Sequence, residues 1–207
     1  MALAQRLDKL GAINLMLTST GEQKVSTLVD DGVNDTDDAQ QVLDEITIEV
    51  LSDGWDFNQI RTVLSPDTSG NISVTNNYLR IDGTDTDYRR RFTVRGNKLY
   101  DLDNATDVFD KAVTLKVTQN LEFDDIPSAC AFFIARSAAR VYQQQTKGDP
   151  QADQILAQQE LRAWERLKKD NAKTQDFNWI HDSRSVTRLS AERGTRYQQD
   201  FENNRPI

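Results

Sequence analysis

Apolar residues recur with helical spacing near both ends of the chain, but its middle follows a different pattern. Near the start, Leu3, Leu7, Leu10, Ile13 and Leu17 lie three or four positions apart, as residues on one side of a helix do. A helix with a single apolar face is unstable alone and needs another element to cover that face. We therefore expect the helices before and after the middle to pack into one bundle, with the middle as an insertion.

The same spacing predicts three further helices. The second begins in the cap region 34–38 and ends at Gly54. The third is the most apolar and begins at Pro127, since proline suits the first turn of a helix. It stops near residue 147, and the segment 149–150 then provides an N-cap aspartate followed by proline. The fourth helix starts there and runs to about Thr174.

Between residues 58 and 120 the pattern changes to short runs rich in β-forming residues. Glycine-containing pairs at 70–71, 82–83 and 96–97 separate these runs, and such pairs supply the positive φ of tight turns. The segment "RFTVRGNKLYD" (91–101) is the clearest hairpin. We therefore expect a small antiparallel sheet, built from runs at 61–64, 71–74, 78–81, 91–94, 98–101 and 112–117.

The final segment is polar, mixed in charge and only sparsely apolar. Ordering such a segment costs about 1 to 2 kcal/mol per residue, so we expect it to become ordered only against a partner or its own bundle. Spaced aromatic and arginine residues are typical of partner-binding tails. A terminus without a partner is the alternative interpretation. The apolar content of the whole chain, 37 %, is lean for a compact enzyme and favours surfaces that are completed by assembly.

These patterns predict an α+β protein. We expect a bundle of about four helices contributed by both halves of the chain, an inserted small antiparallel β-sheet domain and an extended C-terminal tail. The predicted boundaries are 1–57 together with 122–174 for the bundle, 58–121 for the β-rich insertion, and 175–207 for a partner-binding tail.

Acidic residues are concentrated before the β-rich region. Ten acidic residues and no basic one lie between Asp30 and Asp56, and the net charge is -8. This charge argues against nonspecific binding of nucleic acid, which needs clustered Lys and Arg. One interpretation is a solvated helix face whose first turn complements the helix dipole. The other is a surface that DNA passes without sticking, formed by Asp35, Asp37, Asp38, Asp44, Glu45 and Glu49.

No pattern indicates an enzyme, so we predict no catalytic residue, cofactor or metal. His181, the single histidine, lies in the polar tail, and no motif of known catalytic geometry joins it to Cys130. No phosphate-binding glycine loop is present. The acidic turns 82–87 and 101–107 lack the spacing of a helix-loop-helix calcium site, and we expect them to be ordinary solvated turns. Carboxylate pairs suited to glycoside hydrolysis occur by chance in any acidic protein.

The one cationic run is "DYRRRFTVRGNK" (87–98), within the predicted hairpin. Alternate residues of a strand point to opposite faces, so its arginines do not form one patch. We expect a solvated strand that balances nearby aspartates. A contact with nucleic acid or an acidic partner is the alternative.

We expect a soluble protein that does not enter a membrane. No signal-peptide pattern opens the sequence, and the longest apolar run, 129–135, is far shorter than the roughly 20 residues of a membrane helix. The single cysteine, Cys130, excludes an internal disulfide and favours a reducing compartment. Its apolar neighbours predict a core position.

Two motifs flank the acidic helix in a characteristic order: "AINLMLTSTGEQKVSTL" (12–28) precedes it and "LSDGWDFN" (51–58) closes it. This order resembles the tail tubular protein A family, the adaptors of short-tailed bacteriophages related to the autographiviruses. The segment 123–142 also fits, and the rest of the chain resembles the family weakly. At Thr20 and at 23–24 the sequence departs from the isoleucine and proline that relatives often carry. The matching residues are Gly21, Glu22, Val25, Ser26, Leu28, Gly54, Trp55, Phe57 and Asn58.

The resemblance implies a dodecameric ring between the capsid portal and the tail nozzle protein, tail tubular protein B, with a tail fibre as a further partner. Genomic DNA passes through such a ring without specific binding. The ring belongs to the virion, at the capsid-tail junction, and is assembled in the cytoplasm of the bacterial host. The resemblance also implies that the β-rich part faces the tail while the C-terminal tail reaches the portal, through Trp179, Arg184, Arg188, Leu189, Arg193, Tyr197 and Phe201.

Gly54, Trp55, Phe57 and Asn58 lie where the bundle passes into the insertion. A buried aromatic side chain removes about 150 to 250 Å² from water, which contributes several kcal/mol at ~25 cal/mol per Å². We interpret the aromatic pair as a clamp between the two modules, and an anchor between subunits is the competing interpretation.

The predicted function is that of a structural connector, not an enzyme. A cell-wall-degrading hydrolase of the tail and a head-completion protein with a similar helical fold are the alternatives.

Overall fold

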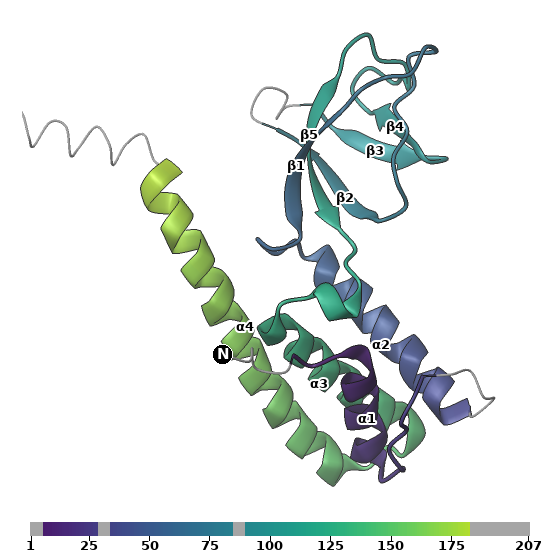
Figure 1. Ribbon diagram of the computed structural model, residues 1–207, viewed down its shortest axis with the longest axis vertical. Helices are drawn as coiled ribbons and strands as arrows, with labels where there is room; N and C mark the ends of the chain where they lie inside the picture. The colour runs from purple at the N-terminus through teal and green to yellow at the C-terminus, as the bar shows by residue number, and fades with distance from the viewer. Residues whose placement is uncertain (1–5, 29–33, 85–89, 183–207) are drawn as a thin grey trace, which may run out of the picture. The chain divides into compact units, whose positions relative to one another are not determined.

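The computed structural model describes residues 6–28, 34–84 and 90–182, with side chains up to residue 173. The chain forms two compact units, residues 1–168 and 169–207. The described residues contain four α-helices and five β-strands, as the α+β prediction requires (Figure 1). The helices are α1 (Lys9–Thr20), α2 (Asn34–Ser52), α3 (Ser128–Thr146) and α4 (Pro150–Asp182). The strands are β1 (Gln59–Leu64), β2 (Tyr78–Gly83), β3 (Phe92–Arg95), β4 (Lys98–Asp101) and β5 (Val113–Gln119), and a short 3-10 helix spans Phe123–Asp125.

Helix α1 starts later than its apolar spacing predicts. Asp8 caps the helix, because its side-chain oxygen accepts a hydrogen bond from the Gly11 N–H at 2.8 Å. Leu7 therefore precedes the helix, although it still packs against the helical core. At the other end Gly21 takes the left-handed conformation, with φ 82°, and ends the helix.

Helix α4 starts as predicted but continues further. Asp149 accepts a hydrogen bond from the Gln151 N–H at 2.8 Å, and Pro150 is the first helical residue. The predicted end at Thr174 is wrong, because the helix reaches Asp182. Its apolar stripe fades near Leu167, but no proline or glycine follows to interrupt the backbone, so the start of the predicted tail is helical.

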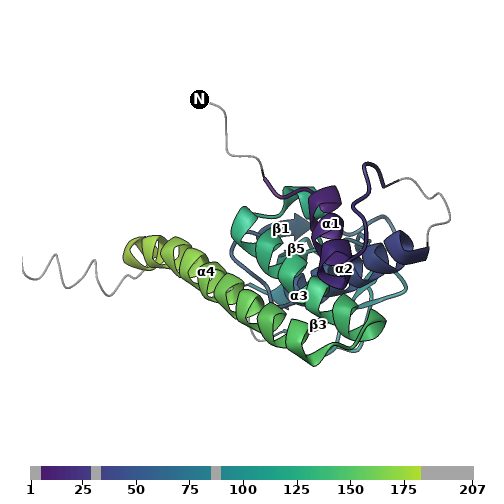
Figure 2. The same cartoon turned by 90° about the horizontal axis from the view of Figure 1, so that it is seen from below.

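The helical core joins segments from both sides of the strands. Helices α1 and α2 both pack on α3 (Figures 1 and 2). Small residues of α3, including Ala131, Ala135 and Ala138, are fully buried and allow close approach. Cys130 is buried among them, as predicted, and burial raises the pKa of its thiol to about 12. The predicted bundle is therefore present.

The strands form a three-stranded antiparallel sheet in the order β1-β5-β2 and a separate hairpin, β3-β4. The predicted hairpin is confirmed, with Gly96 at φ 55° and Asn97 at φ 61° in its turn. The central strand β5 buries Leu115 and Val117 completely. A second apolar cluster covers these side chains, separate from the helical core.

Two predictions for this region are wrong. Residues 71–74 form isolated bridges to Val108 and Lys98 instead of a strand, although Ile72 is buried as a strand residue would be. The pair 82–83 is not a turn, because both residues belong to β2 and pair with β5. In both segments pairing with distant residues outweighs the local turn and strand preferences.

The acidic turn after β4 is exposed at 102–105, as its sequence predicts, but Asp101 at its start is buried. The Asp101 carboxylate is fully buried and accepts hydrogen bonds from the Arg90 side chain, from the N–H groups of Asp103 and Asn104, and from the Asn104 side chain. Arg91 pairs with Asp103 at 2.9 Å. This pairing confirms that arginines of the cationic run balance nearby aspartates. Burial raises the pKa of Asp101, but the hydrogen bonds together lower it more, to about 2.

We predict that Asp101→Asn lowers the free energy of unfolding at pH 7 by about 1 to 3 kcal/mol, because it removes a charged acceptor from four donors. The folded pKa lies below the ordinary value of about 3.9, so the charge stabilises the fold fully above that pH. Its contribution is lost as the pH falls towards 2. Urea unfolding at pH 7 and pH 2.5 should therefore show a smaller difference from the unchanged chain in acid.

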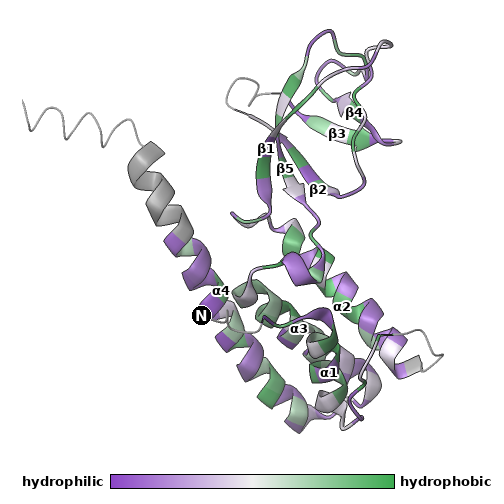
Figure 3. Cartoon of the chain, viewed as in Figure 1, coloured by the Kyte–Doolittle hydropathy of each residue, from purple (hydrophilic) through white to green (hydrophobic). Residues whose placement is uncertain are grey.

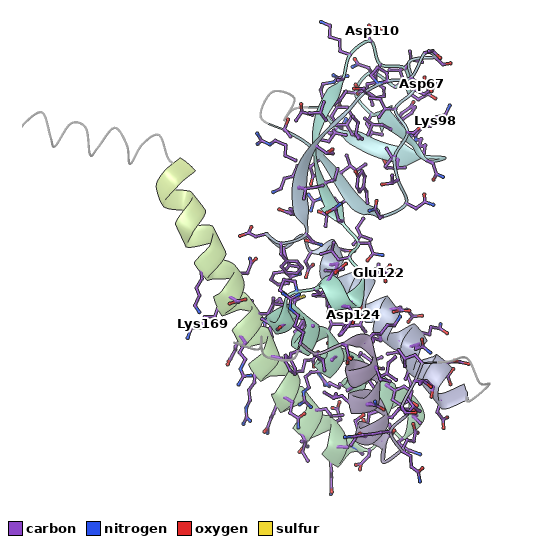
Figure 4. The ribbon with its side chains drawn as sticks, viewed as in Figure 1. Asp67, Lys98, Asp110, Glu122, Asp124 and Lys169 are labelled. Carbon is purple, nitrogen blue, oxygen red and sulfur yellow. The ribbon has the colours of Figure 1, made fainter. Side chains whose placement is uncertain are left out.

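Asp110→Asn is the matched control, because Asp110 is exposed at an end of the β part (Figure 4). An equal effect of Asp101→Asn at both pH values would show that the carboxylate charge is not the stabilising feature.

Candidate functional site at the junction of helices and strands

The chain turns from α2 into β1 within residues 53–58. Gly54 has φ 78°, and its N–H donates to the Leu51 carbonyl at 3.2 Å. A Cβ at this position would lie 2.3 Å from the side-chain nitrogen of Gln59. The backbone conformation therefore favours glycine here, whereas the end of the flexible Gln59 side chain can shift.

Asn58 connects three segments through one side chain that has no exposed surface. Its amide oxygen accepts from the Trp55 N–H at 2.8 Å. Its amide nitrogen donates to the carbonyls of Leu51 at 2.9 Å and Gln119 at 3.0 Å. These bonds join the end of α2, the turn and the last residue of β5. Because all partners are backbone groups, the amide fixes the path of the chain itself.

Trp55 connects the turn at 53–58 to the helices. Its side chain is 8 % exposed, and its indole N–H donates to the Val50 carbonyl at 2.8 Å. The indole packs edge-on against Trp164 of α4, with ring centroids 5.7 Å apart at 85°. Trp164 in turn contacts Phe133 of α3, with centroids 5.0 Å apart. Three aromatic side chains thus connect the turn to α3 and α4.

Apolar contacts reinforce this connection. Phe57 is half-buried against the helical core, and so are Leu79 of β2 and Leu121, which follows β5. The segment between β5 and α3 also contacts α1, because Asp124 accepts from the Lys9 N–H at 2.8 Å. The strands are therefore attached to the helices at more than one point.

The other family-like motif fixes the loop after α1. The Tyr142 hydroxyl contacts the Glu22 carboxylate at 2.9 Å and the Asp35 carbonyl at 3.2 Å. The Asn14 side chain donates to the Val25 carbonyl and accepts from the Val25 N–H. Burial and the neighbouring Glu22 raise the pKa of Tyr142, so the hydroxyl stays protonated as a donor. Sequence reasoning singled out Glu22 and Val25 by resemblance alone and missed Asn14 and Tyr142.

The predicted acidic face lies on the surface of α2. Figure 3 shows hydrophilic and hydrophobic residues alternating along this helix, as expected of one exposed and one buried side. Asp44 forms an ion pair with Lys9 at 2.7 Å, and Glu45 accepts from Gln41 at 2.9 Å. All six acids of the predicted face are exposed: Asp35, Asp37, Asp38, Asp44, Glu45 and Glu49.

The predicted portal-binding residues are not tested by this geometry. Trp179 belongs to α4, but its side chain is outside the described set, as is that of His181. The other predicted contacts lie outside the described residues, namely Arg184, Arg188, Leu189, Arg193, Tyr197 and Phe201.

Two other classes of site are not found among the described residues. Among these residues no group of three or more His, Cys, Asp and Glu side chains is placed to hold a metal ion. None of the helices, over its described part, combines the length and the apolar character needed to cross a membrane.

We predict that Asn58→Ala lowers the free energy of unfolding by about 2 to 4 kcal/mol, because each buried group left unpaired costs about 1 to 3 kcal/mol. Urea unfolding measures this loss. Asn76→Ala is the control, because Asn76 is an exposed asparagine of the same β-rich region. Equal stabilities of the two variants would contradict the role assigned to the Asn58 amide.

Comparison with known proteins identifies the family. A family model described as "Tube: Tail tubular protein" matches residues 10–177. The chain is also 32 % identical over 142 residues to "Tail tubular protein A" of Klebsiella phage KP34, a match that covers 68 % of this chain and 75 % of that protein. This assignment favours a structural tail protein over a wall-degrading enzyme. The chain therefore belongs to the tail tubular protein family and is a structural component of a bacteriophage tail.

Proposed function

We propose that the chain is the subunit of an adaptor ring that joins the capsid portal to the tail nozzle and encloses part of the channel through which DNA leaves. The observation that carries this proposal is membership of the tail tubular protein family over most of the chain. A tube around an axial path is built from copies in head-to-tail contact, so each copy needs two different contact surfaces. A dodecamer is the expected form of the ring.

A ring subunit must hold its parts at a constant angle if the ring is to close. We assign this task to the junction residues Gly54, Trp55, Phe57 and Asn58, which act as a clamp between a helical module (1–57 with 122–174) and a β module (58–121). The buried amide of Asn58 and the contact of Trp55 with Trp164 support the assignment. The segment 175–207 is assigned to partner binding.

If Trp55 is part of this clamp, we expect Trp55→Ala to lower the free energy of unfolding by about 3 to 5 kcal/mol, because a large cavity replaces a buried indole. Ring formation should weaken in parallel. Thermal melting of the isolated chain and native mass spectrometry of the assembly measure the two effects. Unchanged melting with lost assembly would instead identify Trp55 as an anchor between subunits.

We assign five exposed acids of α2 to the channel, namely Asp35, Asp37, Asp38, Asp44 and Glu45. Glu49 is left out of this assignment, because it lines a groove between α2, α3 and α4. A wall that carries fixed negative charge repels the phosphate backbone, so DNA passes without adhering. The concentration of these acids on one helix and their exposure support this assignment.

We assign the C-terminal segment to the portal and the β part to the nozzle, with a tail fibre as a further neighbour. The segment carries arginines between aromatic residues, a composition suited to an acidic and partly apolar partner surface. Trp179, Leu189, Tyr197 and Phe201 would supply its apolar contacts.

Native mass spectrometry of the chain with and without portal rings of the same phage tests the adaptor function. We expect closed rings of the chain on the portal. Replacing Arg184, Arg188 and Arg193 by alanine should weaken portal binding and leave nozzle binding unchanged. A chain that binds neither the portal nor the nozzle would contradict the proposal.

A further inference from the structure

Two hollows of about 550 Å³ lie on the two sides of the first part of α4. The first is lined by α2, α3 and α4, and its floor is apolar, with Val50, Phe133 and Trp164. Glu49 of α2 and Asp53, which follows α2, lie at its edge. We call this the acidic groove, defined by Glu49, Val50, Asp53, Phe133, Leu161 and Trp164.

The charges of the acidic groove are only partly balanced. Glu160, which also lines it, is held by Arg140 at 3.0 Å, and Arg140 binds Asp153 as well at 2.7 Å. The carboxylates of Glu49 and Asp53 have no ion pair or hydrogen bond with other described residues. Beside them the Leu161 side chain is 56 % exposed. An apolar surface with two unbalanced carboxylates fits a partner that is apolar and positively charged.

The opposite side of α4 is positively charged, and so complements the charge of the acidic groove. The second hollow is lined by α1, α3 and α4 and includes Lys24, Arg136 and Gln159, with no carboxylate among its described lining residues. On a helix, positions three and seven residues after Gln159 share its side, so Arg162 and Arg166 extend the positive surface. Both are exposed. Ile155, one turn before Gln159, is 59 % exposed. We call this the basic flank, defined by Lys24, Arg136, Ile155, Arg162 and Arg166.

We propose that the basic flank of one copy of this chain docks into the acidic groove of the next copy and so forms the contact that closes the ring. The inference rests on the proposed function, because only a ring requires this contact. The groove is acidic overall and the flank is basic, although Arg140 and Lys168 also lie at the groove. Each surface combines this charge with exposed apolar atoms. The surfaces lie on opposite sides of one helix, as a head-to-tail contact requires. A two-fold contact would instead bring groove against groove and carboxylate against carboxylate.

Paired charge reversals test this contact. Glu49→Lys with Asp53→Lys makes the groove basic, and Arg162→Glu with Arg166→Glu makes the flank acidic. Each variant alone should require about tenfold or more chain for half-maximal ring formation on portal rings, because like charges then meet. An equal mixture of the two variants should restore rings of alternating copies, since each reversed surface meets its complement. Native mass spectrometry distinguishes the alternating composition.

The controls separate charge pairing from loss of fold. Lysine near the C-terminal end of α2 suits the helix dipole, so thermal melting of the groove variant should stay close to that of the unchanged chain. Asp37→Lys with Glu45→Lys reverses two exposed acids of α2 outside the groove and should leave ring formation unchanged.

The outcomes distinguish this inference from the proposed function. Rings that form normally from each variant alone would overturn the groove contact and leave the adaptor function standing. Loss of rings that the mixture does not restore would also overturn it. If the unchanged chain forms no ring with the portal, the adaptor function fails and this contact fails with it.

Discussion

The buried amide of Asn58 is the interaction on which the rest of the structure depends. It holds the end of α2 and the end of β5 at hydrogen-bonding distance, and it also binds the backbone of Trp55. With the turn fixed in this way, the indole of Trp55 meets Trp164, and α4 gains an aromatic contact in addition to the one with Phe133 of α3. The same aromatic residue, Trp164, forms the floor of the acidic groove. A structural role and a proposed assembly role therefore share one cluster of side chains.

Local patterns predicted the helices well, because each has an apolar side and most have clear end signals. Asp149 and Pro150 marked the start of α4 correctly, and Gly96 with Asn97 marked the hairpin turn. The errors in the β-rich region arise where pairing with distant residues overrides the local signal. Residues 71–74 have strand composition but only isolated bridges, and 82–83 have turn composition but pair with β5. Such choices are made by contacts with residues distant in sequence, which leave no periodic pattern.

The sequence likewise predicted some features of the candidate site and not others. The motif closing α2 pointed to the junction, and the positive φ of Gly54 and the burial of Asn58 supply its physical reason. The contacts of Trp55 with Trp164 and of Asn58 with Gln119 could not be predicted, because no sequence pattern near Trp164 or Gln119 indicates a contact with the junction. The acidic run predicted an exposed helix side from charge alone. The acidic groove, in contrast, is lined by residues of three helices, so it could be recognised only once the fold was known.

We propose that copies of this chain form a closed ring at the capsid-tail joint, with α2 turned towards the axis. A reconstruction of that joint from intact virions by electron cryomicroscopy tests this proposal most directly. We expect one closed ring between portal and nozzle, with the carboxylates of Asp37, Asp38 and Glu45 facing the channel. Density for this chain elsewhere in the particle, or α2 on the outer rim of the ring, would contradict it.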